Sequence, residues 1–306
     1  MSDAALIGLD WGTSSLRAFL FARDGTLLHS ADAAVGIQRV RDGRFRDVFE
    51  TVCKDWLAGA DSLPVIACGM IGSRQGWQET RYLAVPAGFA ELAGALVRID
   101  ELAGRRFAIV PGVCIMPAGR APDVMRGEET QVFGALEAFE LSDATLLRPG
   151  THSKWVQMVD RTIQSFCTFM TGELYEVLSR HSILGRLFPD GEAPLDRRAF
   201  DLGLERSSED PHSMSALLFS VRSEGLIGNL LPDALPSYLS GLLIGSEMAA
   251  AVHDIELDEP VLLVGSEPLT QRYGIALDHF GLPWIAASGQ SAARGLWVIA
   301  QHAGWV

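Results

Sequence analysis

The most informative segment for the fold lies near the N-terminus and reads Leu6-Ile7-Gly8-Leu9-Asp10-Trp11-Gly12-Thr13-Ser14-Ser15. An apolar run, which we expect to be a buried strand, ends at Asp10 and passes into a turn rich in Gly, Thr and Ser. A second apolar run follows at 16–21, and Asp24-Gly25 predicts a tight turn into a third strand at 26–29. The stretch therefore predicts a meander of strands whose first turn carries small polar side chains.

The second half of the chain repeats this pattern. A short apolar run at 145–147 precedes the turn Pro149-Gly150-Thr151-His152-Ser153-Lys154, and two more apolar runs follow the turn. Alignment of the two turns places Gly12-Thr13-x-Ser15 over Gly150-Thr151-x-Ser153. A repeat at such a long spacing predicts a duplicated domain, because solenoid repeats have much shorter periods.

Helical spacing and buried apolar runs alternate along the rest of the chain. Helices are expected at 46–57, 128–140, 172–179, 214–222, 238–252, 268–280 and 291–302, and strands at 64–68, 107–110, 260–264 and 283–286. This alternation predicts an α/β protein with mixed sheets flanked by helices. We expect an N-terminal domain over 1–138 and a C-terminal domain over 139–306, with helix 291–302 packing back on the first domain.

Composition limits the location and the partners of the chain. No apolar run reaches the length of a membrane-spanning helix, and the N-terminus lacks the zones of a signal peptide, so we expect a cytoplasmic protein without a membrane partner. The formal net charge of -13 argues against nucleic-acid binding. The four cysteines form no C-x-x-C pair, which favours reduced thiols over disulfides or zinc. A homodimer is possible, and the sequence does not decide the oligomeric state.

The two Gly-Thr-Ser turns are candidates for phosphate binding. Such a turn can direct several backbone N–H groups and hydroxyls toward one point, which suits phosphate oxygens. The residues expected to bind phosphate are Gly12, Thr13, Ser14, Ser15, Gly150, Thr151, Ser153 and Lys154. Lys154 either contacts a phosphate or points to solvent, and both interpretations stay open. Asp10, at the end of its strand, is a candidate ligand of Mg²⁺.

This arrangement resembles the superfamily of sugar kinases, Hsp70 and actin, in which D-x-G-T-S is the first phosphate motif. The order of an acidic helix start at Glu128-Glu129, a short strand and the Gly150-Thr151 turn is similar to the carbohydrate-kinase branch. The resemblance implies two duplicated ribonuclease H-like domains, as in actin-like ATPases, with an active-site cleft between them.

Several segments are similar to one narrower family, the 2-dehydro-3-deoxygalactonokinases, and their order spans nearly the whole chain. They are 9–14, 69–77, 125–131, 149–155, 169–174 and 241–245. The resemblance implies a kinase that uses ATP and Mg²⁺ to phosphorylate the terminal 6-hydroxyl of 2-dehydro-3-deoxy-D-galactonate in galactonate breakdown. Alternatives are a kinase of another 2-keto-3-deoxy acid or hexonate, and a non-catalytic sensor of nucleotide or sugar.

A carboxylate that accepts the proton of the attacking hydroxyl is a further expectation. In the carbohydrate kinases that this chain resembles, an Asp at the head of the helix before the second phosphate turn has this role, but Gly127 stands at that position here. Glu128 is the first candidate for the base, Glu129 the second, and Asp10 a third. Acidic residues also occur at helix N-termini simply because they favour the helix dipole.

The carboxylate of a sugar acid would pair well with an arginine. Arg74 and Arg126 are the candidates, although an arginine in a polar loop is more often only solvated. Loop 69–77 resembles the sugar-contacting loop of the carbohydrate kinases, and its candidates for substrate binding are Gly69, Met70, Gly72, Ser73 and Trp77. Trp77 could equally anchor the core.

The apolar run before Gly265 and Ser266 looks like the adenosine motif of the superfamily, which has two adjacent glycines. Gly265 and Ser266 are therefore candidates for contact with adenine, and Ser266 departs from the usual pattern. The region lies where a strand ends before a helix, which is a common place for a nucleotide base.

Overall fold

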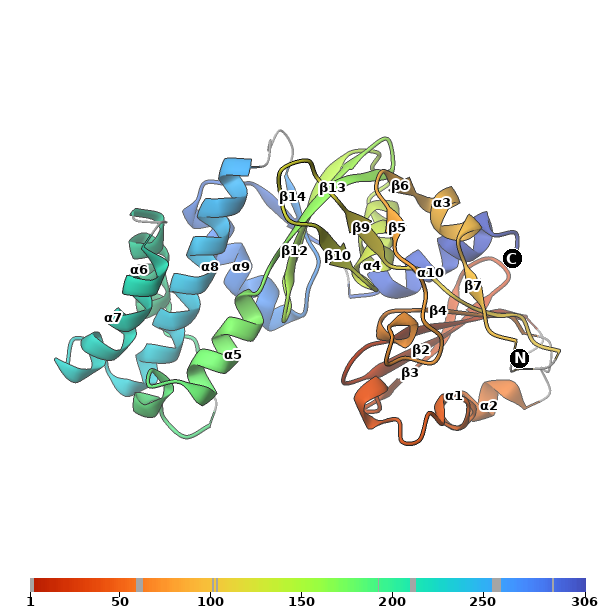
Figure 1. Cartoon of the computed structure of the whole chain (residues 1–306), viewed down its shortest axis with the longest axis horizontal. Coiled ribbons are helices and arrows are strands. Elements are labelled where there is room, and N and C mark those ends of the chain that lie inside the picture. The colour runs from red at the N-terminus through yellow and green to blue at the C-terminus, as the bar shows by residue number, and fades with distance from the viewer. Residues whose placement is uncertain are drawn as a thin grey trace. The chain divides into compact units, whose positions relative to one another are not determined.

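The computed structural model describes residues 3–58, 63–100, 102, 104–191, 193–209, 213–254, 260–287 and 289–306. The chain divides into two compact units, of which Figure 1 shows the elements. Unit 1 comprises Met1–Ala144, Val156–Phe166 and Ala287–Val306, and unit 2 comprises Thr145–Trp155 and Cys167–Ala286.

A six-stranded sheet in the order β3-β2-β1-β4-β8-β7 forms the centre of unit 1. Its strands are β1 (Ala4–Trp11), β2 (Leu16–Ala22), β3 (Leu27–Ala33), β4 (Val65–Cys68), β7 (Val97–Arg98) and β8 (Phe107–Ile109). β1 and β2 pair antiparallel, as do β2 and β3, so the predicted meander is confirmed. β1 pairs parallel with β4, which pairs parallel with β8.

Unit 1 also contains five α-helices and a small sheet among its described residues. The helices are α1 (Phe45–Val52), α2 (Lys54–Leu57), α3 (Phe89–Gly94), α4 (Glu128–Ala138) and α10 (Ser291–His302). The small sheet has the order β10-β9-β5, with β5 (Leu83–Ala84), β9 (Val113–Ile115) and β10 (Asp123–Met125). The single helix expected at 46–57 is wrong in one respect, since Cys53 interrupts it and divides it into α1 and α2.

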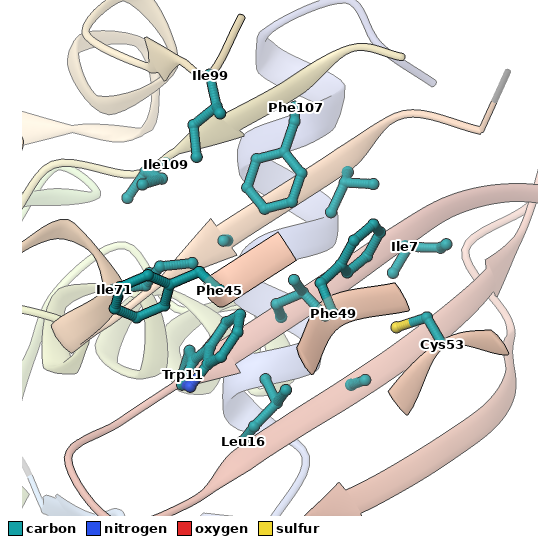
Figure 2. Close-up of a cluster of buried hydrophobic side chains, with 14 of the residues drawn as sticks. Ile7, Trp11, Leu16, Phe45, Phe49, Cys53, Ile71, Ile99, Phe107 and Ile109 are labelled. Atoms are coloured by element: carbon teal, nitrogen blue, oxygen red, sulfur yellow. The ribbon is translucent and has the colours of Figure 1, made fainter. Parts of the chain in front are cut away.

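The two faces of the unit 1 sheet are covered by different helices, because side chains alternate along β1. Trp11 packs edge to face against Phe45 of α1, with ring centroids 5.6 Å apart (Figure 2). Gly8 faces the other way, and a Cβ there would lie 3.2 Å from Leu296 of α10. Asp10 is two residues from Gly8, so it lies on the same face as Gly8 and opposite to the aromatic core.

A second six-stranded sheet has the order β15-β14-β11-β12-β13-β6. Its strands are β6 (Ala87–Gly88), β11 (Ala144–Arg148), β12 (Ser153–Val159), β13 (Thr162–Phe169), β14 (Val261–Leu263) and β15 (Trp284–Ala286). The series β13-β12-β11-β14-β15 repeats the series β3-β2-β1-β4-β8, with the central pairs β11–β14 and β14–β15 again parallel. The predicted duplication is therefore confirmed at the level of strand order.

Unit 2 carries a group of helices (Figure 1). These helices are α5 (Thr171–His181), α6 (Arg197–Glu209), α7 (Met214–Leu226), α8 (Leu235–Asp254) and α9 (Glu267–His279). The sequence analysis missed α6, which is rich in charged residues. Its buried positions Ala199, Phe200, Gly203, Leu204 and Ser207 nevertheless follow helical spacing.

Helix α8 corrects the expectation that no apolar run is long enough to span a bilayer. The segment Pro232–Val252 is long enough to span a bilayer, and its mean hydropathy is 1.2. In the structure 72% of that segment is buried inside the protein, and α8 packs against α6 and α7. Its apolar character is therefore explained by its place in the core of unit 2.

Candidate active site

Asp10 lies at the end of β1 and is only 8% exposed. Arg17 lies directly opposite Asp10 in the β1–β2 register, and its Nη2 donates a hydrogen bond to Asp10 Oδ2. Gln131 of α4 also donates from Nε2 to the same oxygen, at 3.3 Å. Burial lowers the pKa of Arg17, but the charge and hydrogen bond of Asp10 outweigh it and leave that pKa raised. The sequence analysis missed Arg17 and Gln131, which the strand register and α4 bring to Asp10.

The first turn holds its polar side chains at the surface. Gly12 N donates to Ser15 O at 2.9 Å, and Ile37 N donates to Gly12 O at 3.0 Å, so both ends of the turn are held by backbone hydrogen bonds. Thr13, Ser14 and Ser15 are all exposed. The turn can therefore present three hydroxyls and its backbone N–H groups to a ligand.

Two glycine backbones meet beside Asp10. Gly69 and Gly127 have φ angles of 94° and 102°, a region that disfavours side chains. A Cβ on Gly127 would lie 2.9 Å from the Cα of Gly69, and a Cβ on Gly69 would lie 2.8 Å from Trp11 O. The end of β1, loop 69–77 and the start of α4 therefore come together only because both positions are glycine.

Glu128 and Glu129 differ in accessibility. Glu128 is half-buried, and its Oε2 accepts a hydrogen bond from the backbone N of Arg126 at 3.0 Å. Glu129 is fully buried; its Oε2 accepts from Gly127 N at 2.6 Å and its Oε1 from Thr130 Oγ1 at 3.0 Å. Burial raises the pKa of Glu129 to about 8, and the charge of Glu128 adds to the effect. Glu128 is thus the more accessible of the two carboxyl groups.

Arg126 is a buried cation held by loop residues. Its Nη1 donates to Thr80 Oγ1 and its Nη2 donates to Thr80 O at 2.9 Å, while its guanidinium carbon lies 4.3 Å from the centre of the Tyr82 ring. Arg126 Nε and Ser73 Oγ are buried without a hydrogen-bond partner among the described residues. Gly72 lies against the Arg126 guanidinium, since a Cβ at this glycine would be 2.9 Å from Arg126 Nη1. An unpaired buried donor is costly, so each of these two atoms is suited to form a hydrogen bond with a ligand.

The remaining candidates of loop 69–77 have different surroundings. The side chain of Arg74 is 83% exposed and its Nε lies 3.5 Å from Glu79 Oε1. Trp77 stacks on Phe45 and lies 5.1 Å from the Phe107 ring centre, so it belongs to the aromatic core of unit 1. Met70 is partly buried and packs against the same core. The structure thus places Gly72 against Arg126 and Gly69 against Gly127, whereas Arg74 is exposed and Trp77 lies in the core.

The second turn, in unit 2, is closed by the start of α5. A Cβ on Gly172 would lie 2.3 Å from Gly150 O and 2.9 Å from Thr151 Cα, so α5 begins directly against the turn. Glu173 N donates to Thr151 O at 2.9 Å, and the Glu173 carboxylate is hydrogen-bonded to the His152 ring. A helix N-terminus and a glycine turn at one place form a suitable site for an anion.

Ser153 and Lys154 both point into the protein. Lys154 is 4% exposed and its Nζ donates to Thr168 Oγ1 at 2.6 Å, so the interpretation in which it points to solvent is wrong. Ser153 is fully buried, and its hydroxyl lies 3.2 Å from the Tyr273 hydroxyl. Both residues stand at the start of β12, and their partners Thr168 and Tyr273 are distant in sequence, so their burial could not be predicted from the turn alone.

A pocket of about 150 Å³ adjoins the second turn. It is lined by Gly150, Thr171, Gly172, Tyr175, Ser240, Leu243, Ile244, Leu269, Arg272 and Tyr273. Gly265 and Ser266 lie outside this lining; Gly265 packs near Pro149, and Ser266 precedes the first residue of α9. Sequence reasoning missed the lining residues of α8, although Ser240, Leu243 and Ile244 have the spacing of one helical face.

Among the described residues, no group of three or more His, Cys, Asp and Glu side chains could hold a metal ion. A preformed protein cage is therefore absent from that part of the chain. Mg²⁺ is usually held by one or two carboxylates together with water and phosphate oxygens. Asp10 is a donor of the right kind, although Arg17 occupies one of its oxygens.

The buried Glu129 predicts a dependence of stability on pH. Its pKa in the folded state is about 8, above the ordinary 4.5, so the folded chain binds more protons than the unfolded chain between these values. This group should therefore lower the free energy of unfolding as pH rises through that range, by up to about 1.4 kcal/mol per pH unit. Urea unfolding of wild type and Glu129→Gln from pH 5 to 8 tests this; an exposed control is Glu50→Gln. A difference between wild type and Glu129→Gln that stays constant with pH would contradict the prediction.

Comparison with known proteins adds an independent result. A 2-dehydro-3-deoxygalactonokinase of Escherichia coli (strain K12) is 37% identical over 290 residues, which is 94% of each chain. A relative of the same name from Rhizobium meliloti (strain 1021) is 37% identical over 97% of this chain and 96% of its own. A Sinorhizobium meliloti crystal structure described as a 2-dehydro-3-deoxygalactonokinase has a TM-score of 0.90 at 36% identity, covering 97% of this chain and 98% of the other.

A more distant structure shares only the fold. Component A of the (R)-2-hydroxyglutaryl-CoA dehydratase of Acidaminococcus fermentans has a TM-score of 0.54 at 12% identity, covering 97% of this chain and 98% of its own.

The family model described as 2-keto-3-deoxy-galactonokinase matches residues 10–299, which include both glycine turns, loop 69–77 and Arg126. The chain belongs to the 2-keto-3-deoxy-galactonokinase family.

Proposed function

We propose that this protein is an ATP-dependent carbohydrate kinase that phosphorylates the 6-hydroxyl of 2-dehydro-3-deoxy-D-galactonate, as a cytoplasmic step of galactonate breakdown. The observation that carries the proposal is the buried guanidinium of Arg126, which has an unpaired Nε–H in a chain of this family. The relatives are named for a substrate that carries a carboxylate, and a buried arginine is a good partner for that group.

The sugar acid would bind in unit 1 with its carboxylate at Arg126. Thr80 accepts one hydrogen bond from each Nη atom, which leaves the Nε edge of the guanidinium for a ligand. Ser73 Oγ, also unpaired, can donate a second hydrogen bond to the same carboxylate. The Tyr82 ring lies over the guanidinium and would hold it in plane. Thr80 and Tyr82 thereby join the candidates for substrate binding.

ATP would bind in unit 2, with its base in the pocket between α8 and α9 and its phosphates at the Gly150 turn. The pocket offers apolar contacts from Leu243, Ile244 and Leu269, and the N-terminus of α5 begins directly against the turn, which favours an anionic ligand there. In unit 1 the exposed hydroxyls of the Thr13 to Ser15 turn are candidates for further phosphate contacts. Lys154, buried in unit 2, donates to Thr168 Oγ1, which is one route by which it would act near the phosphates.

Phosphoryl transfer depends mainly on positioning and on neutralising charge. Asp10 would hold Mg²⁺ on the oxygen that Arg17 does not occupy, and the ion would neutralise charge on the phosphates when bound. Glu128 is our candidate for the base that accepts the proton of the 6-hydroxyl, since it is partly exposed while both oxygens of Glu129 are occupied.

The first test is release of ADP with a panel of acceptors. We expect turnover with 2-dehydro-3-deoxy-D-galactonate that exceeds turnover with its C4 epimer, with other hexonates and with the corresponding neutral sugars. ADP release coupled to NADH oxidation, with product position determined by NMR, measures this. ADP release that no sugar acid accelerates would overturn the kinase proposal, and preference for another acid would change only the named substrate.

The second test separates the two arginine candidates. Arg126→Lys keeps the charge but loses the planar fork, so we expect the KM for the sugar acid to rise about 10- to 100-fold while the KM for ATP stays unchanged. Arg74→Lys is the matched variant, and its exposed side chain predicts little change. If Arg74→Lys raises the KM and Arg126→Lys does not, the carboxylate site belongs to Arg74 instead.

The third test separates the roles of the two carboxylates. Glu128→Gln should lower kcat about 10²- to 10⁴-fold without changing the Mg²⁺ concentration that gives half-maximal rate. Asp10→Asn should raise that Mg²⁺ concentration, because it removes a charged ligand. Steady-state rates over a Mg²⁺ titration measure both effects. If Glu128→Gln retains kcat, the base lies elsewhere, and a fall in kcat for Asp10→Asn at saturating Mg²⁺ would point to Asp10.

A further inference from the structure

Glu247 of α8 is a buried acid whose partners are hydrogen-bond donors. It is 2% exposed. Trp155 Nε1 donates to its Oε1 at 3.0 Å, and Tyr273 OH donates to its Oε2 at 2.8 Å. The hydroxyl of Thr171 donates to the same Oε2. Burial raises the pKa of Glu247, and these hydrogen bonds act in the opposite direction. A buried carboxyl group is costly, so its position calls for a reason beyond packing.

The donors come from the elements that surround the second turn. Trp155 belongs to β12, Thr171 is the first residue of α5, and Tyr273 belongs to α9. Two of them, Thr171 and Tyr273, also line the pocket beside the Gly150 turn. A single carboxyl group on α8 therefore connects the strand after the turn with two walls of the pocket.

The chemistry of the donors determines where the hydroxyl hydrogens point. Thr171 and Tyr273 each donate their single hydroxyl hydrogen to Glu247 Oε2. The oxygen of Tyr273 is then left to accept from Ser153 Oγ, 3.2 Å away. The hydroxyl hydrogen of Ser153 thus points into this network, so Ser153 anchors the turn from beneath rather than donating to a phosphate.

We propose that Glu247 is a positioning residue of the nucleotide site, which holds the Gly150 turn, the first turn of α5 and α9 in the arrangement that receives the nucleotide. The proposal rests on the proposed function, because it takes the pocket beside this turn as the place of ATP. Glu247 itself does not line the pocket, so it acts on the ligand through Ser153, Thr171 and Tyr273.

The test is Glu247→Gln, which keeps the shape of the side chain. The amide oxygen can still accept from Trp155, but the amide nitrogen then faces the hydroxyls of Thr171 and Tyr273, which must turn round to accept. We expect ADP to bind about 10-fold more weakly, in line with the loss of a hydrogen bond to a charged group. The KM for ATP should rise to a similar extent, with the KM for the sugar acid unchanged. Isothermal calorimetry with ADP and steady-state kinetics measure these effects.

The control is Glu224→Gln in α7. Glu224 is also a buried acid, but it pairs with Arg206 and does not line the pocket of the second turn. This variant should lower Tm and leave the Kd for ADP unchanged. Trp155→Phe, which removes one donor to Glu247 without touching the pocket lining, should weaken ADP binding in the same direction as Glu247→Gln. It keeps the proposal testable if Glu247→Gln does not fold.

The outcomes separate this proposal from the proposed function. If Glu247→Gln or Trp155→Phe lowers Tm while the Kd for ADP stays that of wild type, Glu247 is only structural and the proposal is overturned. If wild type binds ADP but phosphorylates no sugar acid, the proposed function fails while the effect of Glu247 on ADP binding can still be measured. If wild type binds no ADP, both fail.

Discussion

The contact between the backbones of Gly69 and Gly127 places loop 69–77 and the start of α4 beside Asp10 in unit 1. A Cβ on Gly127 would lie 2.9 Å from Gly69 Cα, which is closer than real Cβ atoms approach. Because the two backbones meet there, the start of α4 reaches the end of β1. Gln131 then bonds Asp10, and Glu128 and Glu129 fold back onto the loop before the helix. A side chain at either glycine would clash with the facing backbone.

In unit 2 a different pair of glycines, Gly150 and Gly172, allows a helix to begin against a loop. Gly172 allows α5 to begin against Gly150, just as Gly127 allows α4 to begin against Gly69. Five strands follow the same order in the two sheets, but the charged residues beside the two turns differ. Alignment of the turns places Arg148 at the position of Asp10, and the guanidinium of Arg148 lies close to Gly150. One turn thus follows a carboxylate, which suits a cation, and the other follows an arginine, which suits an anion.

Both units also bury a carboxyl group near their turn. Glu129 and Glu247 accept hydrogen bonds from backbone N–H, hydroxyl or indole groups. Burial disfavours their ionised forms, and the pKa of each group is raised in consequence. Such groups hold neighbouring elements in one arrangement at some cost in stability, which is a common feature of sites that must be preorganised.

Sequence alone determined the local features of this protein. Strand, turn and helix follow from apolar spacing and from glycine, so the meander, the repeated turn and a helix with the bounds of α10 could be predicted from neighbouring residues. Helix α6 was not predicted because it contains many charged residues and its buried face is narrow, so the apolar periodicity is weak. Only the tertiary structure decided which polar side chains meet. Strand register places Arg17 opposite Asp10. Lys154 and Ser153 are buried. Arg126 is buried, whereas Arg74 is exposed. The physical reason is that the direction and the surroundings of a side chain depend on elements that are distant in sequence, whereas the conformation of the backbone depends largely on the residues beside it.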